Sequence, residues 1–501
     1  MSASHSVPPG LPSGTPAGAP SGAPSGAPDW LAQSENPYLQ GPFAPVFDEC
    51  DAADLPVIGE LPRGLDGVFL RNGPNPVHAP RGRYHWFDGD GMVHAVTFRD
   101  GRASYRNRWI RTQDLASERR AGRALWPGYM ERPDPEAPGS GSDGWLKDTA
   151  NTDLVFHNGA VLALWYQCGQ PYRLDPKSLA TLGPENFGGK LERRVSAHAK
   201  VDAATGELLF FDYATQAPFL VHHVVSARGE LLRSTEIELP GPRLPHDMAF
   251  TERYSILMDL PLFWDPQLLE RKIHRLGFHP ELPSRFAVLP RAGGPLRWFE
   301  AEPAYIYHVV NAWDAGDTIV MDVCRVVDPG ARPPEAGGPL GRMLATLRLD
   351  ARLHRYRFDL RTGTTHEERL DDLNTEFPSI DARRQGAPSR YAYIPHIAPD
   401  TQTLLFDALV KYDTTSGSTQ THRFGPGRYC SESPFAPRVG GHEEDDGFVV
   451  CFVHDVNGGN SEAHVLDARD ITAEPLAIVE LPQRVPVGFH ACWVDGTQLQ
   501  G

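Results

Sequence analysis

Four histidines have a distinctive sequence setting and are of a residue type that can bind a metal. His198 lies in VSAHAKVD, His246 in LPHDMAFT, His308 in YIYHVVNAW and His490 in VPVGFHACW, among twenty histidines in the chain. Each is flanked by apolar or small residues at or near the end of a strand-like run. Neutral imidazole nitrogens are suitable ligands for iron(II) and other divalent metals. Only a closed, ring-like fold would bring four such distant residues together, and their spacing alone does not show that they converge.

Other catalytic patterns are missing from the sequence. It contains no GxSxG nucleophile motif, no HExxH zinc motif and no phosphate-binding P-loop. The six cysteines are far apart and include no CxxC pair, so we expect reduced, buried thiols rather than a disulfide scaffold or a structural zinc site. The net charge is −16 and no window is strongly basic, which argues against a nucleic-acid partner.

The elements that must position the histidines are mainly strands. Short apolar runs such as GVFLRNG, LVFHNGAVLALWY and GFVVCFVHDVNGG alternate with DG, NG and GG turn signals from about residue 37 onward. This pattern is typical of hairpins in a β protein. A β-propeller fits, because radial repetition of small sheets accommodates many strands in one domain. Two stretches, 113–123 and 265–276, are expected to be helical, the second with Asp265 as N-cap before Pro266.

The two ends of the chain differ in composition. Residues 1–28 repeat Pro, Gly, Ala and Ser, and we expect a disordered arm there. Residues 29–501 lack a clean internal linker, so we expect a single domain. No apolar run reaches the roughly 18 residues that span a bilayer, and no secretory signal is evident. A cytoplasmic enzyme is therefore expected.

The histidine segments and four further blocks resemble the motifs of the carotenoid cleavage oxygenase family, and they occur in the family's order. The four blocks are LPRGLDGVFLRNGPNP (61–76), RYHWFDGDGMVHAVTF (83–98), TEFPSID (375–381) and ESPFAPR (432–438). The resemblance covers about residues 37–495. It implies an all-β, seven-bladed β-propeller with one Fe(II) on its axis, and a helical and loop cap over the metal site.

The resemblance also implies roles for residues around the metal. Glu376 would hold His308 and Glu432 would hold His490 through the second ring nitrogen, which would also offset the charge of the ion. Thr152 matches a position beside the vacant coordination site of the metal. A third glutamate of the family is replaced by Tyr166 in VLALWYQCG. A phenol oxygen brings no negative charge, so we expect Tyr166 near His246 and a more electrophilic iron.

The substrate implied by the resemblance is a hydrophobic alkene, cleaved with O2 at a C=C bond into two carbonyl products. One branch of the family cleaves carotenoids or apocarotenoids, and the other cleaves stilbenoids or phenylpropanoids. In the second branch a lysine anchors the phenol, whereas this chain has Trp165 at that position. Tyr129 and Phe87 match other pocket positions. The apolar Trp165 favours a carotenoid or apocarotenoid, and the stilbenoid or phenylpropanoid reading remains the alternative.

Two further expectations concern a partner and rival functions. The segment LPLFWDPQLL (260–269) is the best candidate for peripheral membrane contact, if its large apolar side chains are exposed. A helix packed on the propeller is the alternative for this segment. The same motifs also allow an iron-dependent isomerohydrolase of retinyl esters, or a propeller that binds a ligand without catalysis. Four buried imidazoles argue against the non-catalytic reading.

Overall fold

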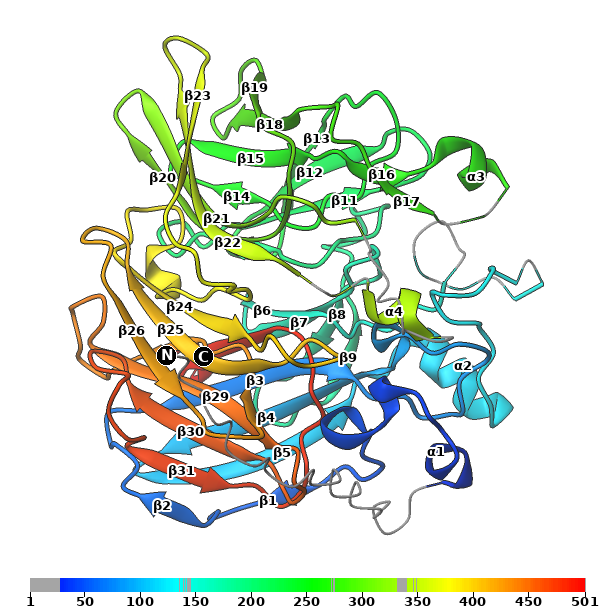
Figure 1. Ribbon diagram of the computed structural model, residues 1–501, viewed down its shortest axis with the longest axis vertical. Coiled ribbons are helices and arrows are strands. Elements are labelled where there is room, and N and C mark those ends of the chain that lie inside the picture. Colours follow the sequence, from blue (N-terminus) through cyan, green and yellow to red (C-terminus); the bar gives the residue numbers. More distant parts are fainter. Residues whose placement is uncertain are drawn as a thin grey trace, which may run out of the picture.

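The protein is described here by a computed structural model. It describes residues 28–500 apart from 135, 138, 140, 142–145, 272, 274, 331–339, 346 and 348. Except for Pro28, the predicted disordered arm lies outside this part of the chain, and the single-domain prediction for 29–501 stays a prediction. Most described elements are antiparallel strands, as Figure 1 shows.

The described strands form a seven-bladed β-propeller, which confirms the predicted fold class (Figure 1). The first blade has the spatial order β1 (Asp51–Ala52), β5 (Arg102–Trp109), β4 (Gly91–Arg99), β3 (Gly67–Pro74) and β32 (Ala491–Asp495). The second contains β6 (Asp153–His157), β7 (Ala160–Leu164), β8 (Tyr172–Leu174) and β9 (Thr181–Pro184). The third contains β10 (Lys200–Val201), β11 (Leu208–Tyr213), β12 (Leu220–Val225) and β13 (Leu231–Glu236).

The next two blades follow the same meander. The fourth contains β14 (Ala249–Phe250), β15 (Tyr254–Asp259), β18 (Ser284–Pro290) and β19 (Arg297–Ala301). A small two-stranded sheet is inserted after β15, consisting of β16 (Leu262–Trp264) and β17 (Leu276–Phe278). The fifth blade contains β20 (Tyr305–Ala315), β21 (Thr318–Val326), β22 (Ala351–Asp359) and β23 (Thr365–Arg369).

The last two blades are joined into one nine-stranded sheet, because β27 (Arg428–Cys430) pairs with a strand of each. The sixth contains β24 (Tyr391–Ile397), β25 (Phe406–Asp413) and β26 (Thr419–Arg423). The seventh contains β28 (Phe435–Pro437), β29 (Gly447–Asp455), β30 (Glu462–Asp467), β31 (Ala477–Glu480) and the early strand β2 (Val57–Gly59).

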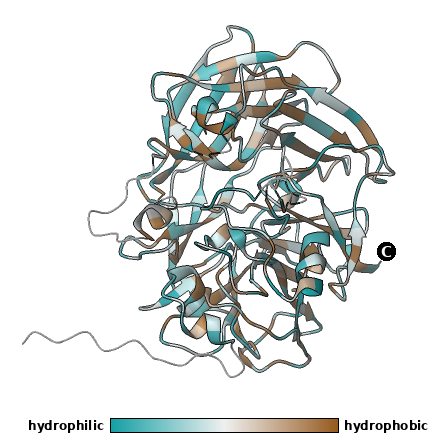
Figure 2. Cartoon of the chain, turned by 90° about the vertical axis from the view of Figure 1, so that its right-hand side faces the viewer, coloured by the Kyte–Doolittle hydropathy of each residue, from teal (hydrophilic) through white to brown (hydrophobic). Residues whose placement is uncertain are grey.

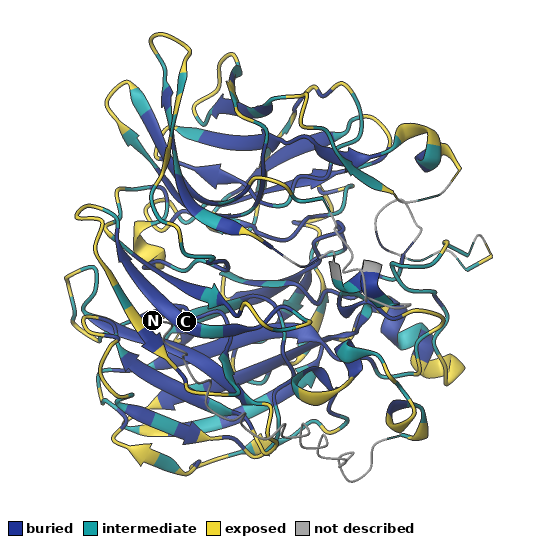
Figure 3. Ribbon diagram, viewed as in Figure 1, coloured by how far each residue is buried: buried dark blue, intermediate teal, exposed yellow. Residues whose placement is uncertain are grey.

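The ring is closed by strands from opposite ends of the chain. Near the C-terminus, β32 pairs with β3, with Leu70 opposite Cys492, and near the N-terminus β2 pairs with β31, with Ile58 opposite Ile478. Apolar side chains pack between the first and seventh blades, and the rings of Phe69 and Phe452 lie 4.7 Å apart between centroids. Figure 3 shows the strands as mostly buried and the turns as exposed, and Figure 2 shows the apolar residues along the strands.

The helices lie together on the right-hand side of Figure 1, at one end of the blades. They are α1 (Asp29–Ala32), α2 (Gln113–Ala121), α3 (Pro266–Glu270) and α4 (Gly341–Ala345). The 3-10 turns are η1 (Pro37–Leu39), η2 (Gly41–Phe43), η3 (Trp86–Asp88), η6 (Ala382–Arg384) and η7 (Gln498–Gln500). No helix in the described residues is long and apolar enough to cross a membrane.

The helix predicted over 113–123 is confirmed. Thr112 caps it by accepting the N–H of Leu115 at 3.0 Å, and it ends at Gly122, whose positive φ of 67° is the usual glycine terminator. The helix predicted over 265–276 is shorter, although Asp265 caps it as expected, accepting from Gln267 and Leu268. It ends at Glu270 because the chain must turn back to form β17 against β16.

The expectation that the apolar side chains of 260–269 are exposed is wrong. Their exposed fractions are between 3% and 9% for Leu260, Leu262, Phe263, Trp264 and Leu269. The two leucines at 260 and 262 pack into one apolar cluster of the fourth blade and its neighbours, and Trp264 and Leu269 pack into another, while Phe263 stacks on His279 at 4.2 Å between ring centroids. These side chains are instead buried against the propeller, which was the alternative expected for this segment. They do not offer the apolar patch on which the membrane-contact prediction depended.

Candidate metal centre

Each blade contributes one residue of the predicted site from a segment at the edge of its sheet. Five of these segments lead into or contain β6, β10, β14, β20 and β32, which stand at sheet edges. The sixth is the stretch 375–379, which bridges to β24, and the seventh precedes β28. The second to seventh blades contribute Thr152, His198, His246, His308, Glu376 and Glu432, in that order, and the first blade contributes His490.

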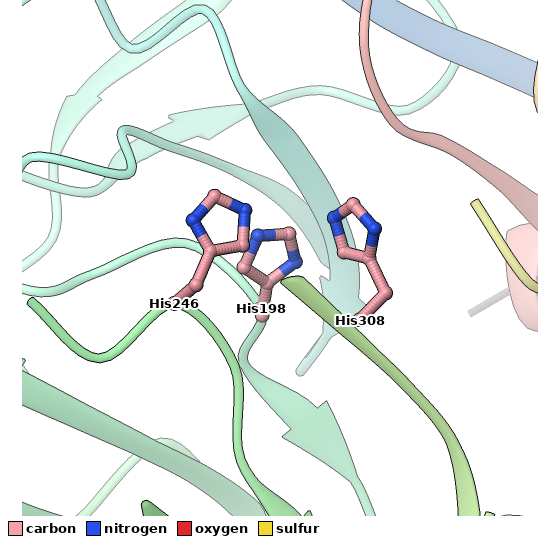
Figure 4. A group of neighbouring side chains, drawn as sticks. All are labelled: His198, His246 and His308. Carbon is pink, nitrogen blue, oxygen red and sulfur yellow. The ribbon is translucent and has the colours of Figure 1, made fainter. Parts of the chain in front are cut away.

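The four predicted histidines converge. The ring centroid of His198 lies 4.7 Å from that of His246, 5.0 Å from that of His308 and 4.6 Å from that of His490. The rings of His308 and His490 are 4.7 Å apart. Figure 4 shows His198, His246 and His308 with their rings close together, and ligand atoms of these three lie within 4.8 Å of one another. These three histidines can hold a metal ion.

Unpartnered ring nitrogens and lowered pKa values make this histidine cluster suitable for binding a metal ion. Within the described chain, Nε2 of His198 and Nε2 of His308 are buried without a hydrogen-bond partner. A buried polar atom of this kind costs free energy unless something binds it. Burial, and then the neighbouring histidines, lowers the pKa of His198, His246 and His308 well below the usual value. The neutral imidazole is the form that ligates metals.

The backbone at His198 is strained to aim its ring. Its φ is +66°, in the left-handed region that β-carbon sterics disfavour for residues other than glycine. The N–H of His198 donates to Oδ2 of Asp153 at 2.9 Å, which helps to hold this conformation. Strain of this kind persists where surrounding contacts fix it, and it is common at functional sites.

Glu376 meets His308 as the resemblance implied. Its Oε2 accepts from Nδ1 of His308 at 2.5 Å and from the N–H of Phe377 at 2.6 Å. The side chain of Glu376 has no exposed surface, and burial raises its pKa to about 8. The hydrogen bond turns Nε2 of His308 towards the other rings.

Glu432 meets His490 in a looser arrangement. Oε1 of Glu432 lies 3.3 Å from Nδ1 of His490, and Oε2 accepts the N–H of Ala491. Burial alone would lower the pKa of His490, but the carboxylates of Glu432, Asp153 and Asp247 together more than offset it, and the net pKa is raised. Glu432 therefore fixes both the ring and the backbone of the fourth histidine.

Tyr166 lies near His246, at 6.1 Å between ring centroids. Its hydroxyl oxygen accepts from Nε2 of Gln167 at 2.6 Å, and no imidazole donates to it in the described chain. The structure thus puts Tyr166 beside His246 without giving it the hydrogen-bonding role of the replaced glutamate. Thr152 is nearby, with its Oγ1 accepting the N–H of Tyr166 at 3.2 Å and donating to Oδ1 of Asn151 at 3.0 Å.

One cavity lies at the metal centre and a second cavity adjoins it. The inner cavity is bordered by Thr152 and three of the histidines, and otherwise by apolar and aromatic side chains: Trp86, Phe87, Tyr166, Tyr307, Leu347, Leu349, Phe377, Leu404 and Phe489. The outer cavity is more polar and contains Tyr129, Trp165 and Gln167 in its wall. Phe87 and Tyr166 line both cavities. The structure therefore brings together the three predicted substrate residues, Phe87, Tyr129 and Trp165.

Two acids of the site, the half-buried Asp153 and the buried Asp247, were not predicted. Asp153 follows Thr152 and holds the backbone of His198. Asp247 follows His246, accepts the N–H of Val309 at 2.8 Å and pairs with Nζ of Lys200 at 2.8 Å. Both carboxylates lie next to residues already singled out, in DTANTDL and LPHDMAF, which is the signal that could have found them.

Comparison with known proteins gives the family. The model of the family described as retinal pigment epithelial membrane protein matches residues 43–495. A carotenoid 9,10(9',10')-cleavage dioxygenase from Phaseolus vulgaris is 36% identical, over 92% of this chain and 90% of its own length. The chain belongs to this family of carotenoid cleavage oxygenases.

Solved structures agree with this assignment. The crystal structure of a lignostilbene dioxygenase from Pseudomonas brassicacearum superimposes with a TM-score of 0.82 at 30% identity, over 92% of this chain and 99% of that one. A cobalt-substituted apocarotenoid oxygenase from Synechocystis gives a TM-score of 0.79 at 29% identity, over 90% and 97% of the two chains. The cobalt in that relative shows that this fold can bind a metal.

Proposed function

We propose that the protein is a non-haem Fe(II) dioxygenase that cleaves a C=C bond of a carotenoid or apocarotenoid with O2 and gives two carbonyl products. One observation carries the proposal: four imidazoles from four blades converge, three of them line an apolar cavity, and two of the four rings have an Nε2 that is buried and unpartnered among the described residues. One iron per chain would be held by His198, His246, His308 and His490. Iron(II), when bound, supplies the redox chemistry by which O2 reacts with an alkene.

The residues around the ligands have roles that follow from their contacts. Glu376 and Glu432 accept from Nδ1 of His308 and His490, so they orient the rings, and with a metal cation bound their carboxylates would offset its positive charge. Thr152 borders the inner cavity and would limit access of water to the metal. Because Tyr166 is uncharged, the metal keeps more of its positive charge than with three carboxylates.

The polyene reading is supported by the wall of the outer cavity. Trp165 stands where a phenol-anchoring lysine would stand. Lys147 lines the same cavity, but its Nζ lies 2.5 Å from Oδ1 of Asp90 and 2.5 Å from Oε2 of Glu118. An ammonium group held by two buried carboxylates is poorly placed to pair with a phenolate.

A stilbenoid or phenylpropanoid alkene is the second candidate substrate, favoured by the similarity to the lignostilbene dioxygenase. Tyr129 supports this reading, because burial raises the pKa of its phenol to about 12 and keeps the hydroxyl available as a donor. Its hydroxyl has no hydrogen-bond partner among the described residues.

The test is an anaerobic reconstitution with Fe(II), followed by aerobic incubation with an apocarotenal and, separately, a hydroxystilbene in labelled O2. Aldehyde products from the apocarotenal that carry the label, and that are lost in His246→Ala, would support the proposal. Cleavage of the hydroxystilbene alone would replace the polyene with the second candidate. The same products formed without O2 would contradict oxygenation, and retinol released from a retinyl ester without O2 would point to the isomerohydrolase.

A further inference from the structure

The inner and outer cavities meet at a pair of aromatic rings. Phe87 and Tyr166 are the two side chains that line both, and their ring centroids lie 4.9 Å apart in an edge-to-face arrangement. Rings at this separation are in van der Waals contact. A long substrate therefore cannot pass between them while they stay in place.

The position of Tyr166 is fixed from several sides. Its hydroxyl accepts from Gln167, a buried side chain that lines only the outer cavity. Its carbonyl oxygen accepts from the hydroxyl of Tyr213 at 2.8 Å and from that of Ser196 at 3.2 Å. With the N–H bond to Thr152, the backbone is held on both sides, so the ring has little freedom to swing away from Phe87.

We propose that Tyr166 is a specificity-determining residue that, with Phe87, closes the end of the inner cavity and limits how far an alkene substrate extends beyond the metal centre. This inference rests on the proposed function with a polyene held in the inner cavity, so that Tyr129 and Trp165 in the outer cavity do not contact the substrate. The ring of Tyr166 provides the barrier, and the bond from Gln167 fixes its orientation. The preferred substrate has one end that stops at this pair, so its scissile bond lies at a fixed distance from that end.

The experiment compares two polyene aldehydes that share the same end group and differ in chain length. For each, kcat and KM are measured with iron-loaded protein, and the ratio of kcat/KM for the long and the short aldehyde is calculated. Tyr166→Ala removes the ring that, with Phe87, separates the two cavities, so the long aldehyde can extend into the outer cavity. We expect this ratio to rise by at least about tenfold, the discrimination that pocket sterics typically provide. Tyr166→Phe keeps the ring and should keep the ratio within about twofold of the wild-type value.

Tyr254→Ala is the matched control, because this half-buried tyrosine lies in β15, outside both cavities. It should leave the ratio unchanged. Where Tyr166→Ala does not fold, Phe87→Ala and Tyr166→Leu provide the same test, because each removes one of the two rings that separate the cavities.

An unchanged ratio in folded, iron-loaded variants that still cleave the short aldehyde would overturn the inference. A ratio that rises equally in Tyr166→Phe would also overturn it, because the ring would then not be the barrier. Failure of the wild-type protein to cleave either aldehyde would instead count against the proposed function, so the two failures are distinguishable.

Discussion

Replacing Glu376 by Gln isolates the charge of the carboxylate that holds His308. A single oxygen, Oε2, takes both hydrogen bonds, at 2.5 Å from Nδ1 of His308 and 2.6 Å from the N–H of Phe377. The amide oxygen of Gln can occupy that place and keep both bonds. The NH2 group then replaces Oε1, which is buried without a partner within the described chain.

The magnitude follows from these contacts. Loss of a carboxylate behind a histidine ligand typically weakens metal binding by about 10- to 100-fold, or about 1.4 to 2.7 kcal/mol. The buried NH2 group of Gln costs about 1–3 kcal/mol of unfolding free energy if nothing accepts from it. We therefore expect Glu376→Gln to lower the Fe(II) affinity. In the metal-free protein this cost is opposed by the removal of a carboxyl group whose pKa burial raises to about 8, so denaturation serves to show that the variant is folded.

The assay is an anaerobic competition titration of Fe(II) against a chelator, combined with chemical denaturation of the metal-free protein. Glu443→Gln is the matched control, since Glu443 is exposed and its replacement should change neither quantity. An Fe(II) affinity of Glu376→Gln equal to that of the wild type would refute the reasoning, because His308 would then not depend on the carboxylate.

Two further predictions concern stability. Asp88 accepts N–H bonds from His85 and Tyr129, and burial raises its pKa to about 7. The folded protein thus holds this proton to higher pH than the unfolded chain, and stability falls as pH rises from about 4 to 7, by up to about 1.4 kcal/mol per unit. Asp88→Asn should remove this contribution to the pH dependence of the unfolding free energy, measured by chemical denaturation. A difference in unfolding free energy between wild type and variant that does not change with pH would contradict this prediction. Leu262→Ala should cost about 2–5 kcal/mol of unfolding free energy without changing vesicle binding, and reduced vesicle binding would restore the membrane-contact prediction.

The strands and the four histidines could be predicted from the sequence because their signals are local. Apolar runs broken by DG, NG and GG mark hairpins, and each histidine lies next to an edge segment of its blade. That the rings meet required the family resemblance, since convergence depends on the pairing of β32 with β3 and β2 with β31 across most of the chain. No local pattern encodes such a pairing.

Other features could not be predicted because they depend on tertiary contacts. The apolar residues of 260–269 are compatible with an exposed patch or with a packed insertion. They are buried because the segment forms the inserted pair of strands β16 and β17, which packs on the propeller. The replacement of a glutamate by Tyr166 was visible, but its bond from Gln167 and its contact with Phe87 were not. The carboxylates of Asp153 and Asp247 gain their roles from backbone N–H groups of distant segments.

X-ray absorption at the iron edge, on anaerobically reconstituted wild-type protein and His490→Ala, tests the four-histidine centre most directly. His490 is the informative position, because ligand atoms of the other three histidines already lie within 4.8 Å of one another. We predict one iron per chain with four imidazole ligands in the wild type, and three imidazoles with weaker binding in His490→Ala. Three imidazoles in the wild type, or identical coordination and affinity in the variant, would contradict the account.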